Sequence, residues 1–196
     1  MKDLAEKPYD VDDMRMAVDT LRKGGVILYP TDTVWGLGCD ATNAAAVEKV
    51  FAIKHRPDNK SMLVLVDSTD RAKMYADGLT DVACDLMEMS DKPLTLVIDG
   101  AKNIDKKLVA DDGSVGIRVT REKFSHDLCY RLGRPIVSTS VNISSQPAAK
   151  VFADISPEML ETVDYVVKYR QGDKRQSKPS SIIKLKADGQ ITIIRQ

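Results

Sequence analysis

One stretch of the sequence, residues 26–56, shows how polar groups follow an apolar strand. It begins with Val-Ile-Leu-Tyr, which predicts a buried strand, and breaks at Pro30 into threonine hydroxyls and a carboxylate. After two glycines and a short helical pattern, it ends on Lys54 and Arg56. Loops that leave a rigid sheet place polar groups where a ligand reaches them, and two cations beside such a loop favour an anionic ligand. The stretch therefore predicts a binding site at a strand end.

Length and composition favour one α/β domain over residues 1–196, because 196 residues suffice for one sizeable core and no linker or repeat divides them. No apolar run approaches the ~20 residues of a membrane span, and the N-terminus has no apolar signal segment. A cytoplasmic protein without membrane contact is expected. The charges balance at 29 against 29, so affinity for phosphate or nucleic acid requires a local patch.

Several common motifs are missing from the sequence. Cys39, Cys84 and Cys129 are widely spaced and form no Cys-x-x-Cys pair, which argues against a disulfide framework or a zinc site and favours buried thiols. Neither the P-loop nor the Rossmann glycine pattern occurs, and there is no Gly-x-Ser-x-Gly nucleophile segment. Gly36 and Gly38 are better explained by a turn or a close approach of another backbone.

Capping residues and periodicity predict alternating helices and strands on a mixed sheet. We expect helices at 11–21, 44–55, 68–76, 80–89 and 124–132 and one that starts at 156, and strands at 26–29, 62–66, 94–98, 115–119, 135–142, 165–169, 182–185 and 191–194. The last two strands are expected to form a hairpin.

The strand of residues 135–142 turns from apolar to polar at its end. Ser138, Ser140 and Asn142 there offer hydroxyl and amide groups that suit hydrogen bonds to a polar ligand. An ordinary loop that satisfies its own backbone groups is an equally good explanation from these residues alone.

Three groups of cations have both a solvent-exposed and a ligand-binding explanation. Arg118 lies in an apolar strand and cannot be buried cheaply without an anionic partner, but strand alternation can point it to water, and the segment alone favours water. Lys54 and Arg56 can be a solvated helix exit. The basic run 168–178 is best explained as a solvated loop, with a phosphate or RNA contact as the alternative.

Five segments, in this order along the chain, resemble one known family. They are Tyr-Pro-Thr-Asp-Thr-Val-Trp-Gly-Leu-Gly from Tyr29, Lys54-x-Arg56-Pro57, Val-Gly-Ile-Arg-Val from Val115, Ser140-x-Asn142, and Pro-Ser-Ser-Ile from Pro179. Together they resemble the YrdC/Sua5 family of threonylcarbamoyl-AMP synthases, whose hallmarks include the Lys-x-Arg and Ser-x-Asn motifs. The resemblance extends over nearly the whole chain, which is similar to the short TsaC type.

The resemblance implies a single YrdC-like domain over residues 1–196, with a twisted mixed parallel and antiparallel sheet, flanking helices and a concave basic cavity. It also implies a nucleotidyltransferase that converts L-threonine, bicarbonate and ATP into threonylcarbamoyl-AMP and pyrophosphate, with Mg²⁺ on the triphosphate. The product would supply the t6A37 modification of tRNA through partner proteins. A paralogue of the YciO type, or a module that binds double-stranded RNA or tRNA without synthase activity, remains the alternative.

The family's functional residues match particular positions of this sequence. By resemblance, the L-threonine ligands are Thr33, Arg118, Ser138 and Ser180, with Arg118 on the carboxylate. The nucleotide ligands are Lys54, Arg56, Ser140, Asn142 and Arg195, of which Lys54 and Arg56 are also catalytic, and no residue is a metal ligand. Trp35, Leu65, Thr120 and Ser181 stand where the family more often has Tyr, His, Pro and Thr.

Overall fold

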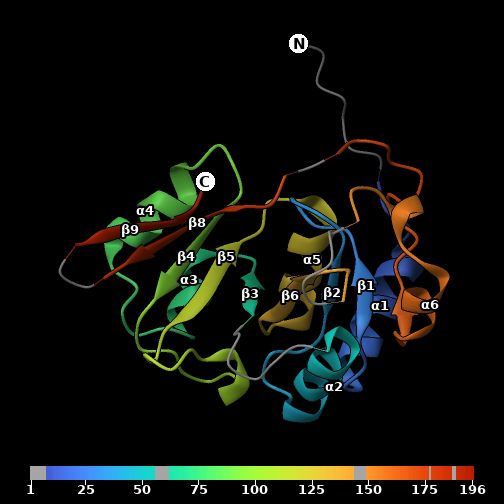
Figure 1. Ribbon diagram of the computed structural model, residues 1–196, viewed down its shortest axis with the longest axis horizontal. Helices are drawn as coiled ribbons and strands as arrows, with labels where there is room; N and C mark the ends of the chain where they lie inside the picture. The colour runs from blue at the N-terminus through green and yellow to red at the C-terminus, as the bar shows by residue number, and fades with distance from the viewer. Residues whose placement is uncertain (1–7, 56–61, 144–148, 177, 187–188) are drawn as a thin grey trace.

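The described part of the computed structural model contains one sheet of nine strands, in the order β7-β1-β2-β6-β3-β5-β4-β8-β9 (Figure 1). The described residues are 8–55, 62–143, 149–176, 178–186 and 189–196, so Arg56 and Pro57 lie outside them. The strands are β1 (Ile27–Tyr29), β2 (Gly36–Gly38), β3 (Leu63–Val66), β4 (Leu94–Ile98), β5 (Val115–Val119), β6 (Ile136–Ser140), β7 (Tyr165–Val166), β8 (Ser181–Leu185) and β9 (Ile191–Arg195). Three neighbouring pairs are parallel and five are antiparallel, which confirms the expected mixed sheet.

Except for the helix that follows Glu122, the described helices begin at the capping residues that the sequence predicts. They are α1 (Val11–Arg22), α2 (Ala44–Lys54), α3 (Thr69–Lys73), α4 (Asp81–Met89), α5 (Lys123–Leu132) and α6 (Pro157–Glu161), with short 3₁₀ turns at Lys106–Leu108 and Phe152–Asp154. The Asn43 side chain accepts from the Ala46 amide at 3.1 Å and so caps α2. His55, with φ of 47°, ends α2 in a left-handed conformation. Lys54 is therefore the last residue of α2, next to the candidate site.

Strand β2 was not predicted from the sequence. Its two glycines explain why the sequence pattern missed it and why a strand fits at this place in the sheet. Glycine is a poor strand former, but β2 pairs antiparallel with β1 and with β6. A Cβ on Gly38 would lie 2.6 Å from Cε1 of Tyr29 and 3.0 Å from the Val137 oxygen. Gly38 therefore allows three strands to approach closely, which confirms the role predicted for it.

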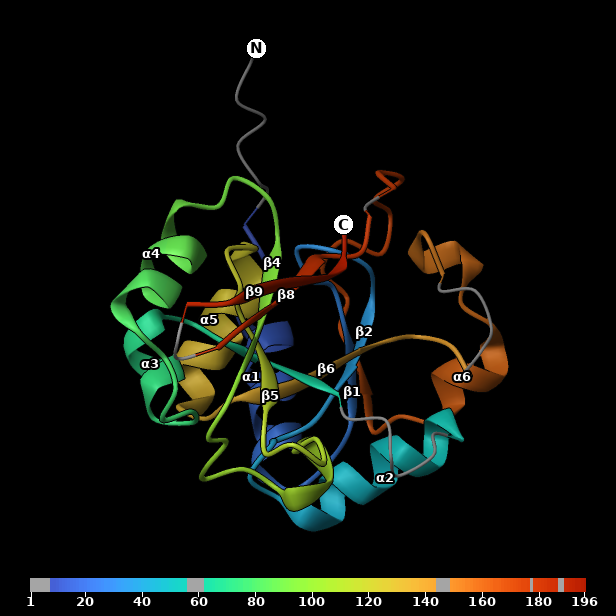
Figure 2. The same ribbon diagram turned by 60° about the vertical axis from the view of Figure 1, so that its left-hand side comes forward.

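Two apolar clusters cover the two faces of the sheet. On one face, residues such as Val64, Ile117 and Val137 pack with α2, α3 and α4. On the other face, Leu65 and Ile136 pack with α1 and α5. Figure 2 shows α3 and α4 at one end of the molecule and α2 and α6 at the other. All three cysteines are free and buried, as expected.

Polar residues continue the face that α1 and α5 cover only in part. Ser138 lies two residues beyond Ile136 and pairs with Leu63, while Arg118 pairs with Leu65. Alternation along each strand keeps these side chains on one face. The apolar cluster under α1 and α5 therefore gives way to a polar surface on the same face of the sheet. Among the residues described, no helix is both long and apolar enough to cross a membrane.

Candidate active site

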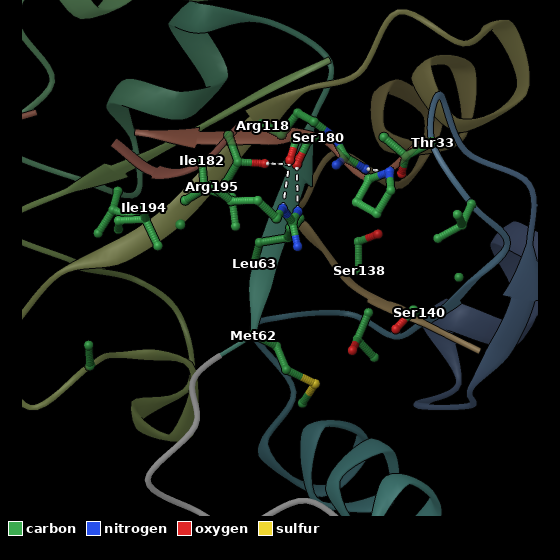
Figure 3. Close-up of a pocket in the computed structure, with 18 of the residues that line it drawn as sticks. Thr33, Met62, Leu63, Arg118, Ser138, Ser140, Ser180, Ile182, Ile194 and Arg195 are labelled. Atoms are coloured by element: carbon green, nitrogen blue, oxygen red, sulfur yellow. Dashed lines mark hydrogen bonds between the residues drawn. The ribbon is translucent and has the colours of Figure 1, made fainter. Parts of the chain in front are cut away.

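A cavity of about 650 Å³ lies over this polar surface (Figure 3). Its walls come from the loop between β1 and β2, from the exposed sides of β3 to β6, and from the C-terminal strands. It is lined by seven of the residues that the sequence assigns to a site, namely Thr33, Arg118, Ser138, Ser140, Asn142, Ser180 and Arg195. The fold thus brings together segments that lie far apart in the chain.

Arg118 is buried in the wall of this cavity. Only 2% of its surface is exposed, so the interpretation that β5 points it to water is wrong. Its Nη2 lies 3.1 Å from Oδ1 of Asp32 and donates to the Thr33 hydroxyl at 3.4 Å. Its Nε is buried and has no hydrogen-bond partner among the described residues. A buried guanidinium with an unpartnered N–H beside a cavity is suited to an anionic ligand.

The loop between β1 and β2 is fixed by its own hydroxyl groups. The Thr31 hydroxyl donates to the Val34 oxygen at 2.7 Å and accepts from the Thr33 amide at 3.1 Å. The hydroxyls of Thr31 and Thr33 are also 3.1 Å apart. Threonine side chains commonly organise turns in this way. The hydroxyl of Thr33 is therefore held in place next to Arg118.

A second arginine, Arg170, also holds the loop between β1 and β2 in place. Arg170 donates from Nη1 to the Thr31 oxygen at 3.2 Å, and its Nε pairs with Asp173 at 3.1 Å. Its Nη1 also lies 3.7 Å from the carboxylate of Glu122, which caps α5. The Arg170 side chain is only 17% exposed, so the interpretation of the basic run as a solvated loop is wrong at this residue. The backbone of Arg170 has φ of 64°, a conformation that costs energy outside glycine.

Lys54 connects the two motifs that the sequence singles out. It is 1% exposed, and its amine donates to the backbone oxygens of Ser140 and Asn142 at 2.5 and 2.8 Å. The Asn142 side-chain oxygen lies 3.3 Å from the same amine and accepts from the Ser140 hydroxyl at 2.5 Å. The interpretation of Lys54 as a solvated helix exit is therefore wrong. Contact between Lys54 and a phosphate remains a prediction, as does every role of Arg56.

Ser180 and Arg195 meet on the opposite wall. Arg195 donates from Nε to the Ser180 oxygen at 2.9 Å and from Nη2 to its hydroxyl at 3.3 Å. The Ser180 hydroxyl is also 2.9 Å from that of Thr95. Burial and the nearby charge of Arg118 lower the pKa of Arg195, so the two guanidinium groups lie within electrostatic reach of each other. An anion between them would interact with both.

Sequence reasoning missed the partners of these residues and part of the cavity lining. Arg170 carries no motif signal, and Asp32 lies in the first family motif but was assigned no role. Other lining residues without such a signal are Met62, Thr95, Asp112, Lys184 and Ile194. The hydrogen bond from Lys184 lowers the pKa of Asp112 to about 2. Trp35 packs on Phe152 with ring centroids 4.9 Å apart and also lines the cavity.

Fold and cavity together define an α/β protein whose site is suited to a small polar molecule with negative charge, since arginines, hydroxyls and apolar side chains line one cavity. The family model of Sua5, YciO and YrdC proteins, described as "Telomere recombination", matches residues 19–196. The chain belongs to this family.

Three known proteins illustrate the similarity. A threonylcarbamoyl-AMP synthase of Pseudoalteromonas translucida (strain TAC 125) is 36% identical over 169 residues, which are 85% of this chain and 89% of that protein. The crystal structure of E. coli YciO has a TM-score of 0.84 at 26% identity and covers 97% of this chain and 91% of its own. P. abyssi Sua5 complexed with L-threonine has a TM-score of 0.81 at 22% identity and covers 92% of this chain, which spans 53% of that chain. At this identity the Sua5 likeness shows the fold alone.

Proposed function

We propose that the protein is an enzyme, a threonylcarbamoyl-AMP synthase, with ATP and L-threonine as substrates. Membership of the family and 36% identity to a synthase over most of both chains support this assignment. The structural observation that carries it is the buried guanidinium of Arg118 in the wall of a cavity large enough for both substrates.

In this proposal, L-threonine binds at the Arg118 end of the cavity. Its carboxylate accepts from the guanidinium of Arg118, because a guanidinium edge matches the two oxygens of a carboxylate. The hydroxyls of Thr33 and Ser138 lie on the same side of the cavity and Ser180 on the other (Figure 3). These hydroxyls supply donors and acceptors to the polar groups of threonine.

The nucleotide lies along Ser140, Asn142 and Arg195, with Lys54 and Arg56 near its phosphates. The threonine amine reacts with bicarbonate to give a carbamate and water. A carbamate oxygen then forms a bond to the α-phosphorus of ATP, and the bond from that phosphorus to the β-phosphate oxygen breaks to release pyrophosphate. Cations and oriented donors suffice for such a transfer, and no protein nucleophile is required.

Magnesium is proposed to enter with the triphosphate, where it neutralises the phosphate charge when bound. Among the described residues, no group of three or more His, Cys, Asp or Glu side chains is placed to hold a metal ion. Asp112, a carboxylate in the cavity lining, is engaged by Lys184 and Ser114. The phosphates and water would therefore provide the oxygen ligands of the ion.

We further propose that residues 1–196 act as one domain in the cytoplasm, where other proteins use the product for the t6A37 modification of tRNA. Release of an adenylate requires such a consumer, because a mixed anhydride with phosphate is readily hydrolysed in water. Direct contact with tRNA or double-stranded RNA is part of the alternative function, and no described feature of the cavity favours it.

The test is pyrophosphate release from ATP by the purified protein with bicarbonate and Mg²⁺, with L-threonine present or omitted. We expect release that depends on threonine and is lost in Arg118→Lys, because an ammonium cannot reproduce the guanidinium edge. Arg134→Lys is the matched control, since Arg134 pairs with Asp40 and does not line the cavity. A folded protein without threonine-dependent release would overturn the proposal and favour the YciO-type or RNA-binding alternative.

A further inference from the structure

Asp32 is a buried carboxylate beside the cation of the cavity. Its side chain is 12% exposed, and its Oδ1 lies 3.1 Å from Nη2 of Arg118. That oxygen accepts no hydrogen bond from any described group, so its contact with Arg118 is ionic and poorly aligned. Burial raises the pKa of Asp32, and the charges of Arg118 and Arg170 oppose that rise. The site thus retains a carboxylate whose burial is unfavourable.

The nitrogen of Arg118 that Asp32 contacts determines how a ligand can bind the guanidinium. Asp32 and the Thr33 hydroxyl both contact Nη2, while Nε has no partner. A carboxylate in a two-bond pair across Nε and Nη would occupy the edge that best fits a substrate carboxylate. Asp32 instead compensates the charge of the guanidinium through a single nitrogen, Nη2.

We propose that Asp32 is a positioning residue for the amino-acid substrate, which it serves by holding Arg118 at Nη2 so that the rest of the guanidinium is oriented toward the substrate carboxylate. This inference rests on the proposed function. Without the Asp32 charge, the buried guanidinium lacks a counter-ion and reorients toward other acceptors, so the carboxylate site loses its geometry. Threonine affinity therefore depends on a residue outside the cavity lining.

Four titratable groups face Asp32 from the surrounding elements. They are Arg118 of β5, Arg170 after β7, Tyr29 of β1 and Cys129 of α5. Burial raises the pKa of Tyr29 and of Cys129, so both are neutral, and the two arginines stay charged. Of these five groups, Asp32 is the carboxylate, so a fall in pH neutralises it while both arginines keep their charge. As the pH falls through its raised pKa, Arg118 loses its counter-ion and threonine binding weakens.

The experiment measures L-threonine binding to the whole protein by calorimetry, without ATP or bicarbonate, across pH 5 to 7.5. For Asp32→Asn we expect a Kd about tenfold higher than wild type at neutral pH, as for the loss of one charged contact. The KM for threonine should rise by the same factor, while kcat and the KM for ATP stay nearly unchanged. The acid-side weakening seen in the wild type should be absent from the variant.

Asp40→Asn is the matched control, because Asp40 is a buried carboxylate that pairs with Arg134 at 2.7 Å away from the cavity lining. Equal threonine affinity in wild type and Asp32→Asn, or the same loss in Asp40→Asn, would overturn the inference. Lost threonine binding together with an equal fall in kcat and in the affinity for ATP would also overturn it in favour of a structural role. The pH dependence of wild-type binding tests the inference without any variant.

If the wild type binds no threonine at any pH, the proposed function itself fails. If the wild type binds threonine but the affinity does not depend on Asp32, only the inference fails.

Discussion

The amine of Lys54 lies 2.8 Å from the backbone oxygen of Asn142, and this contact ties the end of α2 to the turn that follows β6. Ser140 and Asn142 line the cavity, whereas Lys54 does not. Lys54 therefore holds this part of the cavity wall in place through its hydrogen bonds. The Lys-x-Arg and Ser-x-Asn motifs, which are separate in the sequence, share hydrogen bonds in the structure. Loss of Lys54 should therefore affect both the wall and the fold.

For Lys54→Met we expect pyrophosphate release to fall by at least about 100-fold, because the Ser140–Asn142 wall loses its anchor and the site loses a charge. The free energy of unfolding should fall by about 1–3 kcal/mol, since buried backbone oxygens lose their donor. Urea unfolding and a pyrophosphate assay measure the two effects. Activity lost with wild-type stability would instead mean that the lysine acts only on the substrate.

The two glycines of β2 provide a matched pair of variants. A Cβ on Gly38 would lie 2.6 Å from Tyr29, so Gly38→Ala should lower the free energy of unfolding by about 1–3 kcal/mol through overpacking. A Cβ on Gly36 would lie 3.5 Å from the Ser138 hydroxyl, an ordinary contact at the cavity wall. Gly36→Ala should therefore melt like the wild type but show a higher KM for threonine. Thermal melts and steady-state kinetics check both, and equal melting temperatures for the two variants would refute the argument.

Arg170 should affect threonine binding through the loop that it holds. Arg170→Asn removes the donor to the Thr31 oxygen but keeps a residue that tolerates positive φ. We expect a higher KM for threonine with little change in kcat. Arg175→Asn is the control, because Arg175 pairs with the same Asp173 but has a side chain that is 62% exposed. Similar kinetics for both variants would argue against a specific role of Arg170.

The pH dependence of stability should reflect two buried carboxyl groups. Burial raises the pKa of Asp32 and of Glu122 above the ordinary values of 3.8 and 4.5. The folded state then binds protons more readily than the unfolded state, so the free energy of unfolding rises as the pH falls from neutrality toward those values. Urea unfolding at several pH values measures this rise, and Asp32→Asn should flatten it. A slope unchanged in the variant would show that Asp32 does not contribute.

At lower pH the trend should reverse. Hydrogen bonds from Arg175 to Asp173 and from Lys184 to Asp112 hold the pKa of each carboxyl below its usual range. Groups of this kind stabilise the fold above their unfolded pKa and lose that contribution as the pH falls through the folded one. One side chain of each pair is largely exposed, Arg175 at 62% and Asp112 at 55%, so solvent screens both interactions and each contributes little.

Local signals in the sequence were sufficient for most helices and strands. Asn43 caps α2 and Gly133 ends α5, because caps depend on one side chain and the nearest backbone amides. The strands around Leu65 and Ile136 follow from short apolar runs. The family motifs also predicted which residues share one cavity, although the cavity itself depends on the pairing of distant strands.

The sequence by itself determined the α/β class, the capped helices and the family, because each depends on short-range patterns. Only the tertiary structure decided that Arg118 and Lys54 are buried, since burial of a charge depends on a partner from elsewhere in the chain. Asp32 lies in the loop between β1 and β2, whereas Arg118 lies in β5. The backbone oxygens that accept from Lys54 belong to Ser140 and Asn142, at the end of β6 and just beyond it. An isolated strand segment carries no information about such partners, so alternation alone pointed Arg118 to water. The energy of a buried ion is set by the groups that the whole fold brings around it.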